Sequence, residues 1–291
     1  MSTFLLKLIA LLVMIVDHTG VVFQPLFDVS TYQLIRSIGR IAFPIFLFFV
    51  AEGCRRTSNI KLYLLRLGLF ALITELPFDL ALASFNRTPD GIFDLGAYNL
   101  MEDQNIFWTF FLGVLCVYLY REFNTGFKRL IYLMGIPLIV SLVYLADSVY
   151  GYKIDYGAAG VLFVFILYIL PYGDQEPGQP LRMSGLGKFL RIAALFCLVF
   201  YLYIISWVDL DYIGMILAES GFSMVIELLP QLLSDYAVKL MFSACIALFL
   251  LSFYNNKRGM RLRWLFYAAY PLHLLVLGVI RLMYVVPIQT R

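Results

Sequence analysis

The sequence predicts an all-α integral membrane protein, a single polytopic bundle in which about nine helices cross the bilayer. Of its 291 residues, 62% are hydrophobic and only 14% are charged, whereas an average soluble domain carries roughly 25% charge. The mean hydropathy is +0.85. The apolar residues also gather in repeated runs close to the ~20 residues that a helix needs to cross a membrane.

The apolar runs follow one another without an internal repeat, so residues 1–291 are interpreted as one domain. The predicted spans are roughly 4–24, 33–54, 60–83, 105–120, 130–146, 157–171, 189–207, 236–253 and 264–286. The stretch 212–230 is apolar but is broken by Glu219, Glu227 and Pro230. We expect it to be an interfacial or re-entrant segment, and a tenth span is the alternative. The first run is too long for a signal peptide and lacks a small-x-small cleavage site.

Basic residues predict the orientation, because cytoplasmic loops carry an excess of Lys and Arg. Four alternate loops hold the basic residues Arg55, Arg56, Lys61, Arg121, Lys128, Arg129, Arg182, Lys188, Arg191, Lys257, Arg258, Arg261 and Arg263. The intervening loops hold Arg87 and Lys153 and are otherwise acidic. This pattern predicts a cytoplasmic N-terminus and, with nine spans, a C-terminus outside.

The two histidines of the chain, His18 and His273, both lie inside apolar runs. An ionisable side chain there costs roughly 2.5–3.5 kcal/mol on insertion scales, so each needs an explanation. His18 follows Asp17, and it lies about 20 Å along the first span, in the outer half of the membrane. A histidine suits general-base chemistry because it titrates near neutral pH. The alternative for His18 is a structural role as a core histidine bonded to a carbonyl. For His273, a core role and a catalytic role are both open.

Adjacent helix residues point about 100° apart. Two candidates for the group that orients His18 therefore stay open: Asp17 and a carboxylate from another helix.

Charged pairs mark the second and third spans at the same predicted depth. Arg36 and Arg40 are four residues apart, as are Glu75 and Asp79, so each pair shares a helix face. Two interpretations stay open: a functional site, or a buried ion-pair lattice that holds the two helices together.

Two residues of the second span affect its packing and shape, with Pro44 further down the span, and two others join the outer cluster. Gly39 allows close helix approach, and Pro44 is expected to bend the second span and free a carbonyl. Asn105 and Asp155, at the starts of the fourth and sixth spans, converge on the same level.

Several function classes lack support. The chain contains no HExxH, GxSxG or Walker A motif, which disfavours zinc proteolysis and ATP-driven transport. The four cysteines form no CxxC pair, so no metal site is indicated. The net charge of +3 is small, and no nucleic-acid partner is expected.

A family resemblance rests on six stretches: LKLIALLVMIVDHTG, LIRSIGRIAFPIFLFFVAEG, YLLRLGLFALITELPFDL, NIFWTFFLGVL, DYGAAGVL and YPLHLLVLG. Together they resemble the TraX family, named for a conjugation protein that acetylates the N-terminus of F-type pilin. The family looks related to acyltransferase-3-like membrane enzymes, which move acetyl groups from acetyl-CoA to extracytoplasmic acceptors. The resemblance is strongest over residues 5–85, and the stretch 172–260 matches little.

The resemblance implies an acetyltransferase in the bacterial cytoplasmic membrane, with acetyl-CoA as donor and a peptide N-terminus, glycan or lipid as acceptor. It implies that Asp17 and His18 belong to the active site and that Arg36 and Arg40 bind or polarise substrate. His18 would deprotonate the acceptor or take the acetyl group itself, and an arginine would stabilise the oxyanion. Orienting roles are expected for Glu75, Asp79, Asn105, Asp155 and His273.

Cytoplasmic basic residues are expected to bind the phosphates of acetyl-CoA. These are Arg55, Arg56, Lys61, Arg66, Arg121, Lys128 and Arg129. Topology alone also explains them, so that alternative stays open. The rival function is a transporter or flippase that uses the polar cluster as a substrate or proton pathway, and a third is an assembly scaffold without chemistry.

Overall fold

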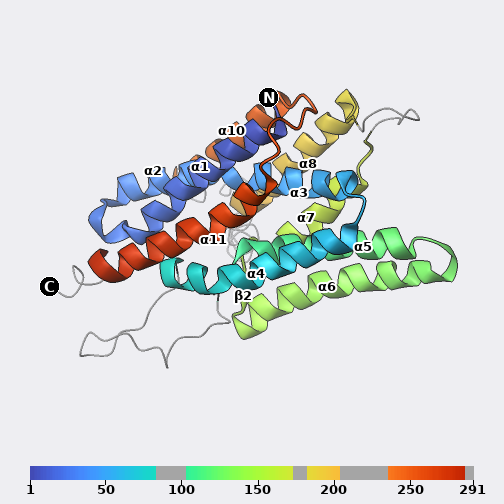
Figure 1. Ribbon diagram of the computed structural model, residues 1–291, viewed down its shortest axis with the longest axis horizontal. Coiled ribbons are helices and arrows are strands. Elements are labelled where there is room, and N and C mark those ends of the chain that lie inside the picture. The colour runs from blue at the N-terminus through green and yellow to red at the C-terminus, as the bar shows by residue number, and fades with distance from the viewer. Residues whose placement is uncertain (83–102, 173–181, 204–234, 286–291) are drawn as a thin grey trace, which may run out of the picture.

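The computed structural model describes residues 1–82, 103–172, 182–203 and 235–285, which fold into a helical bundle (Figure 1). Its helices are α1 (Thr3–Val22), α2 (Val29–Gly39), α3 (Ala42–Arg56), α4 (Ile60–Leu82), α5 (Ile106–Phe123), α6 (Arg129–Tyr150), α7 (Gly157–Ile169), α8 (Gly185–Tyr203), α10 (Asp235–Ser252) and α11 (Arg263–Ile280). Shorter elements are the parallel strands β1 (Asp103–Gln104) and β2 (Lys153–Ile154), the 3₁₀ turns η1 (Gln24–Leu26) and η2 (Gly126–Lys128), and a π-helical turn, η4 (Arg281–Val285). The predicted all-α membrane bundle is confirmed.

Each predicted span contains a helix, but the spans are not nine equivalent membrane-crossing helices. Within the described residues, six helical stretches are long and apolar enough to cross a bilayer. They are Thr3–Val22, Val29–Arg56, Ile106–Phe123, Gly126–Tyr150, Gly185–Tyr203 and Trp264–Met283. Helices α7 and α10 are apolar but shorter, and the 23 residues of α4 include four charged ones. The predicted interfacial segment 212–230 lies outside the described residues.

The second predicted span is two helices and not one bent helix. Helix α2 ends at Gly39 and α3 begins at Ala42. In a continuous helix Pro44 would leave the carbonyl of Arg40 without a donor, and its ring would clash with that carbonyl. The N–H groups of Arg40 and Ile41 bond instead to carbonyls three residues earlier, at 3.1 and 3.2 Å. The bend predicted at Pro44 is therefore a full interruption, with Arg40 at its corner.

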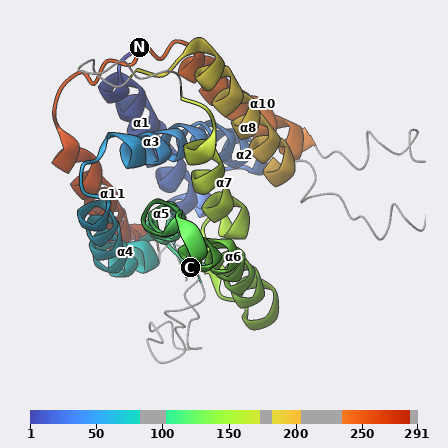
Figure 2. The ribbon, with the colours of Figure 1, turned by 90° about the vertical axis from the view of Figure 1, so that its right-hand side faces the viewer.

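Helix α3 lies inside the bundle, and α6 lies at its edge (Figure 2). In α3, Ile45, Leu47 and Phe48 are fully buried. In α6, a row of large apolar side chains is exposed: Leu130, Ile131, Leu133, Met134, Leu138, Leu142 and Leu145. An apolar outer surface of this kind suits lipid, which covers membrane helices without a hydrophobic cost.

Helix α11 returns to the start of the chain by packing against both α1 and α4. Gly278 of α11 lies against Leu80 of α4, where a Cβ on the glycine would come within 2.9 Å of the leucine Cβ. Small residues at such crossings allow close helix approach in membranes. Because α11 also packs against α1, the two histidines of the chain, His18 and His273, lie on neighbouring helices.

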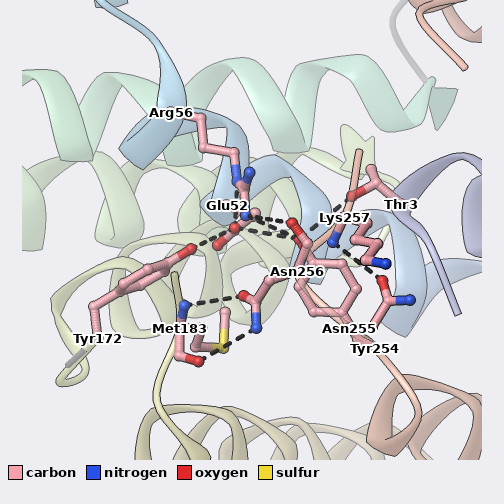
Figure 3. A network of polar contacts seen from close by, with 9 residues as sticks. All are labelled: Thr3, Glu52, Arg56, Tyr172, Met183, Tyr254, Asn255, Asn256 and Lys257. Atoms are coloured by element: carbon pink, nitrogen blue, oxygen red, sulfur yellow. Dashed lines mark hydrogen bonds and ion pairs between the residues drawn. The ribbon is translucent and has the colours of Figure 1, made fainter. Parts of the chain in front are cut away.

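One end of the bundle is tied by a polar network centred on Glu52 of α3 (Figure 3). Its Oε1 accepts hydrogen bonds from Arg56 Nε and from the Tyr172 hydroxyl, both at 2.5 Å. The Tyr254 hydroxyl donates to the same oxygen at 3.5 Å and accepts a bond from Thr3 at 3.3 Å. These residues come from helix ends that the charge pattern assigns to the cytoplasm. The network therefore joins the predicted cytoplasmic ends of four parts of the chain.

We expect Glu52→Ala to lower the thermal unfolding temperature in detergent by several degrees. The substitution leaves the Arg56 guanidinium and two tyrosine hydroxyls without their shared acceptor, and breaking a buried ion pair typically costs about 3–5 kcal/mol. Glu122→Ala, at an exposed position of α5, is the matched control and should leave the temperature unchanged. Equal unfolding temperatures for both variants would contradict the role given to Glu52.

Candidate active site

Asp17 of α1 is held between the two arginines of α2. Arg36 Nη1 donates to one carboxylate oxygen at 2.6 Å, and Arg40 Nη2 lies 3.5 Å from the other. The Asp17 side chain is only 10% exposed, and those of Arg36 and Arg40 are 23% and 15% exposed. Within the described residues their ion-pair partner is Asp17, so the lattice that would join them to the third span does not form. The arginines share a face, as their spacing predicts, but that face meets the first helix.

Gly39 makes this contact possible. A Cβ at Gly39 would lie 2.3 Å from Cβ and Cγ of Asp17, far inside van der Waals contact. A Cβ at Gly20 of α1 would likewise lie 2.4 Å from Cγ2 of Ile35 in α2. The close approach that the sequence predicts for Gly39 is therefore an α1–α2 contact, and it sets the depth at which Asp17 meets the arginines.

His18 contacts the other histidine of the chain. His18 Nδ1 lies 2.7 Å from His273 Nε2, with the two rings within 4° of parallel. His273 Nδ1 in turn lies 2.7 Å from the backbone carbonyl of Ala269, one helical turn earlier in α11. Tyr270 packs edge-on against both rings, with centroid distances of 5.8 and 5.5 Å. The hydrogen-bond partner of the His18 ring is thus a second imidazole, where a carboxylate from another helix was one expectation.

A cavity of about 240 Å³ lies beside these groups, between α1, α2, α3, α4, α5 and α11. The polar side chains in its wall are Asp17, His18, Arg36, Arg40, Asp155, Tyr156 and Tyr270. The rest of the wall is mostly apolar, with Phe43, Phe46 and Phe110 among its members. A few polar groups converging on an apolar cavity are typical of a small-molecule site.

The segment before α7 brings Asp155 and Tyr156 to this cavity. The pairing of β1 with β2 and a 3.1 Å bond from Asp155 N to the Gln104 carbonyl fix its position. Tyr156 has a left-handed backbone (φ 61°), stacks on Phe43 and accepts a bond from Arg40 Nη1 at 3.4 Å. Such strain in a residue other than glycine persists only where the surroundings enforce it, often at functional sites. The sequence analysis missed Tyr156, although it follows Asp155 directly.

The other predicted orienting residues join α4 to α5 beside the cavity. Asn105 is fully buried, caps α5 through Phe107 N, and donates to the Ala71 carbonyl and to Glu75. Glu75 also accepts a bond from Trp108 Nε1 at 3.0 Å. Asp79 is buried on the same helix. The cavity wall, as far as the structure describes it, includes Asp155 from this predicted set but neither Asn105 nor the two carboxylates of α4.

A larger cavity, of about 720 Å³, lies nearer the Glu52 network. Five of its wall residues also line the smaller cavity: Met14, Phe46, Ile106, Phe110 and Tyr270. Its basic side chains are Lys7, Arg56, Arg66, Arg258 and Arg261. The two cavities therefore share an aromatic and aliphatic wall. Five basic side chains line the larger cavity, and His18 lines the smaller one together with Arg36 and Arg40.

The predicted phosphate-binding set is only partly placed in this cavity. Arg56 and Arg66 line it, whereas Arg55 donates to the carbonyls of Tyr168 and Leu170. The other members lie elsewhere: Arg121 bonds the Cys54 carbonyl, Lys61 lies over Tyr118, and Lys128 and Arg129 are exposed. Sequence reasoning assigned Arg258 and Arg261 to topology alone and overlooked Lys7, because these residues meet only through the return of α11 to α1.

Within the described part of the chain, no group of three or more His, Cys, Asp or Glu side chains is arranged to hold a metal ion.

The fold and this geometry define a helical membrane protein whose histidine pair and arginine–aspartate cluster lie at the wall of a cavity. The chain belongs to the TraX family, since the family model described as TraX protein matches residues 2–176 and 189–281. It is also similar to the probable fimbrial assembly protein FimC, serogroup H1, of Dichelobacter nodosus, with 29% identity over 167 residues. That alignment covers 57% of this chain and 61% of the relative, less than two thirds of the relative's length. No solved structure matches the chain.

Gly39→Ala is expected to destabilise the protein by roughly 1–3 kcal/mol, the usual range for overpacking. The new methyl group would displace Asp17 and separate it from both arginines. Thermal unfolding in detergent measures the effect, with Gly185→Ala as control because a Cβ there meets no atom within 4 Å. An unfolding temperature for Gly39→Ala no lower than that of the control would rule out the close α1–α2 contact.

Proposed function

We propose that this protein is a transmembrane acetyltransferase that moves an acetyl group from cytoplasmic acetyl-CoA to an amine or hydroxyl at the outer side of the membrane. One observation carries the proposal: the cation-lined cavity and the His18 cavity share a wall. An anionic donor bound in the first is next to the cavity that His18 lines. Membership of the TraX family supports this function.

The larger cavity has the character that acetyl-CoA requires. Its five basic side chains suit phosphates, and its volume lies within the roughly 300–1,000 Å³ of sites that bury drug-sized ligands. Aromatic residues, among them Phe49, Phe266 and Tyr267, also line this cavity. In the proposal, the pantetheine arm follows this apolar wall and brings the thioester to His18.

His18 then acts as the base. It takes the proton of the acceptor amine or hydroxyl as that group attacks the thioester carbonyl. The oxygen of the thioester carbonyl gains negative charge. The Arg36 or Arg40 guanidinium, in the wall of the same cavity, stabilises this charge. Collapse of the intermediate breaks the carbon–sulfur bond and releases CoA, whose thiolate recovers the proton. An acetyl-histidine intermediate is the alternative route, and a burst of CoA release before acceptor turnover distinguishes it from direct attack.

A pilin-type acceptor is favoured by the comparisons. The relative is named as a probable fimbrial assembly protein, and a subunit N-terminus that emerges at the outer face would supply the amine. Asp155 and Asp17 in the cavity wall are the anionic groups that an ammonium group would meet there.

His18→Ala is expected to lower CoA release from acetyl-CoA at least ~100-fold, because general-base catalysis contributes about 10²–10⁴. The assay uses detergent-purified protein, with equal unfolding temperatures as the folding check. Slow hydrolysis by the wild type without an acceptor is enough to read the effect. If the wild type neither releases CoA nor is stabilised by acetyl-CoA, the acetyltransferase proposal is wrong and the transporter function takes its place.

The cations of the larger cavity should control donor binding. Replacing Arg258 and Arg261 together by alanine is expected to raise the KM for acetyl-CoA about tenfold or more, since hydrogen bonds to charged groups contribute roughly 1.5–3 kcal/mol. Replacing Lys128 and Arg129, which are exposed and outside the cavity, is the matched control with the same loss of charge. Equal KM changes in the two double variants would contradict a bound donor in this cavity.

A further inference from the structure

The contact between the two histidines carries a specific assignment of protons. They are separated by 255 positions in sequence, and their facing nitrogens, His18 Nδ1 and His273 Nε2, are 2.7 Å apart. A contact this short between two ring nitrogens is a hydrogen bond, so one nitrogen donates and the other accepts. The geometry alone allows either direction.

The carbonyl of Ala269 decides the direction. A carbonyl oxygen can only accept, so the His273 Nδ1 that lies 2.7 Å from it carries a hydrogen. In a neutral imidazole the second nitrogen is then unprotonated, and His273 Nε2 must accept from His18 Nδ1–H. His18 in turn has an unprotonated Nε2. Nε2 is therefore the ring nitrogen of His18 that can accept a proton from a group in the cavity that His18 lines.

Charge favours the neutral pair over a protonated one. Arg36 and Arg40 line the same cavity as His18, and the carboxylates in that wall are Asp17, which pairs with both arginines, and Asp155. The two positive charges already face two negative ones, so a proton on either imidazole in the resting site would add an unbalanced third positive charge, which burial and repulsion by the arginines oppose.

We propose that His273 is the positioning residue that holds His18 in the tautomer with Nε2 unprotonated and that shares the positive charge when His18 accepts a proton. This rests on the proposed function, in which His18 is the base. The chain Ala269 carbonyl, His273, His18 performs the task that a carboxylate behind a histidine performs in other acid–base sites. An imidazole suits an interior position because, unlike a carboxylate, it is neutral at rest.

Nitrogen NMR of the histidine rings tests the assignment directly. The chain has only two histidines, so histidine-selective ¹⁵N labelling of the full chain in lipid nanodiscs, with a tag that lacks histidine, gives four ring signals. We expect both Nδ1 atoms to be protonated and both Nε2 atoms to be unprotonated. Protonated Nε2 on His18 in the wild type would overturn the proposal.

Two variants separate positioning from simple packing. His273→Gln keeps an amide oxygen to accept from His18 and an amide N–H to donate to Ala269, whereas His273→Leu keeps volume without either group. For His273→Leu we expect a mixture of His18 tautomers and a kcat for CoA release lower by roughly 10- to 100-fold, a range typical of lost outer partners, at unchanged KM for acetyl-CoA. His273→Gln should retain the His18 tautomer and most of the rate.

An unchanged His18 tautomer in His273→Leu would overturn the proposal, as would equal rates for the two variants at matched unfolding temperatures. The NMR result does not depend on acetyl transfer. Failure of CoA release with the expected tautomers would therefore remove the proposed function while leaving the proton arrangement standing.

Discussion

The structure depends on one buried charge, the Asp17 carboxylate between two guanidinium groups. A carboxylate inside a membrane bundle is stable only if it is paired and hydrogen-bonded, and Arg36 and Arg40 supply both pairs. This requirement fixes the approach of α1 to α2, and Gly39 removes the side chain that would prevent it. The end of α2 at Gly39 also contributes to this pairing. The interruption that Pro44 forces places Arg40, the second arginine, at the corner between α2 and α3. With Asp17 fixed toward α2, the next residue, His18, points toward α11.

In the proposed function, the two ends of the bundle have different tasks. The predicted cytoplasmic end is closed by the Glu52 network, and the larger cavity beside it is lined by five cations. The opposite cavity has one histidine, two arginines and two aspartates in its wall. Between them stand mainly aromatic and aliphatic side chains, which suit a long flexible arm. A donor on one side and an acceptor on the other is the arrangement that acetylation across a membrane needs.

The fold class followed from the sequence because apolar runs report directly which segments lie in lipid. Helix spacing likewise predicted the shared face of Arg36 and Arg40. The partner of that face did not follow, because the rotation of a helix about its axis depends on packing: Asp17, and not Glu75, meets the arginines. Nor did the contact of His18 with His273 or the presence of Lys7 and Arg258 in one cavity, since proximity between the two ends of a chain leaves no local pattern. The contacts of Asn105 did not follow from the sequence either: it caps α5 and donates to the Ala71 carbonyl and to Glu75.

A structure of the protein with CoA bound tests the central claim most directly. The account predicts that the phosphates contact Arg258 and Arg261 and that the sulfur reaches within about 4 Å of His18, near the ~3–3.5 Å of a reactive arrangement. It also predicts that the pantetheine arm follows the wall shared by the two cavities. CoA bound outside the larger cavity, or with its sulfur directed away from His18, would contradict the account.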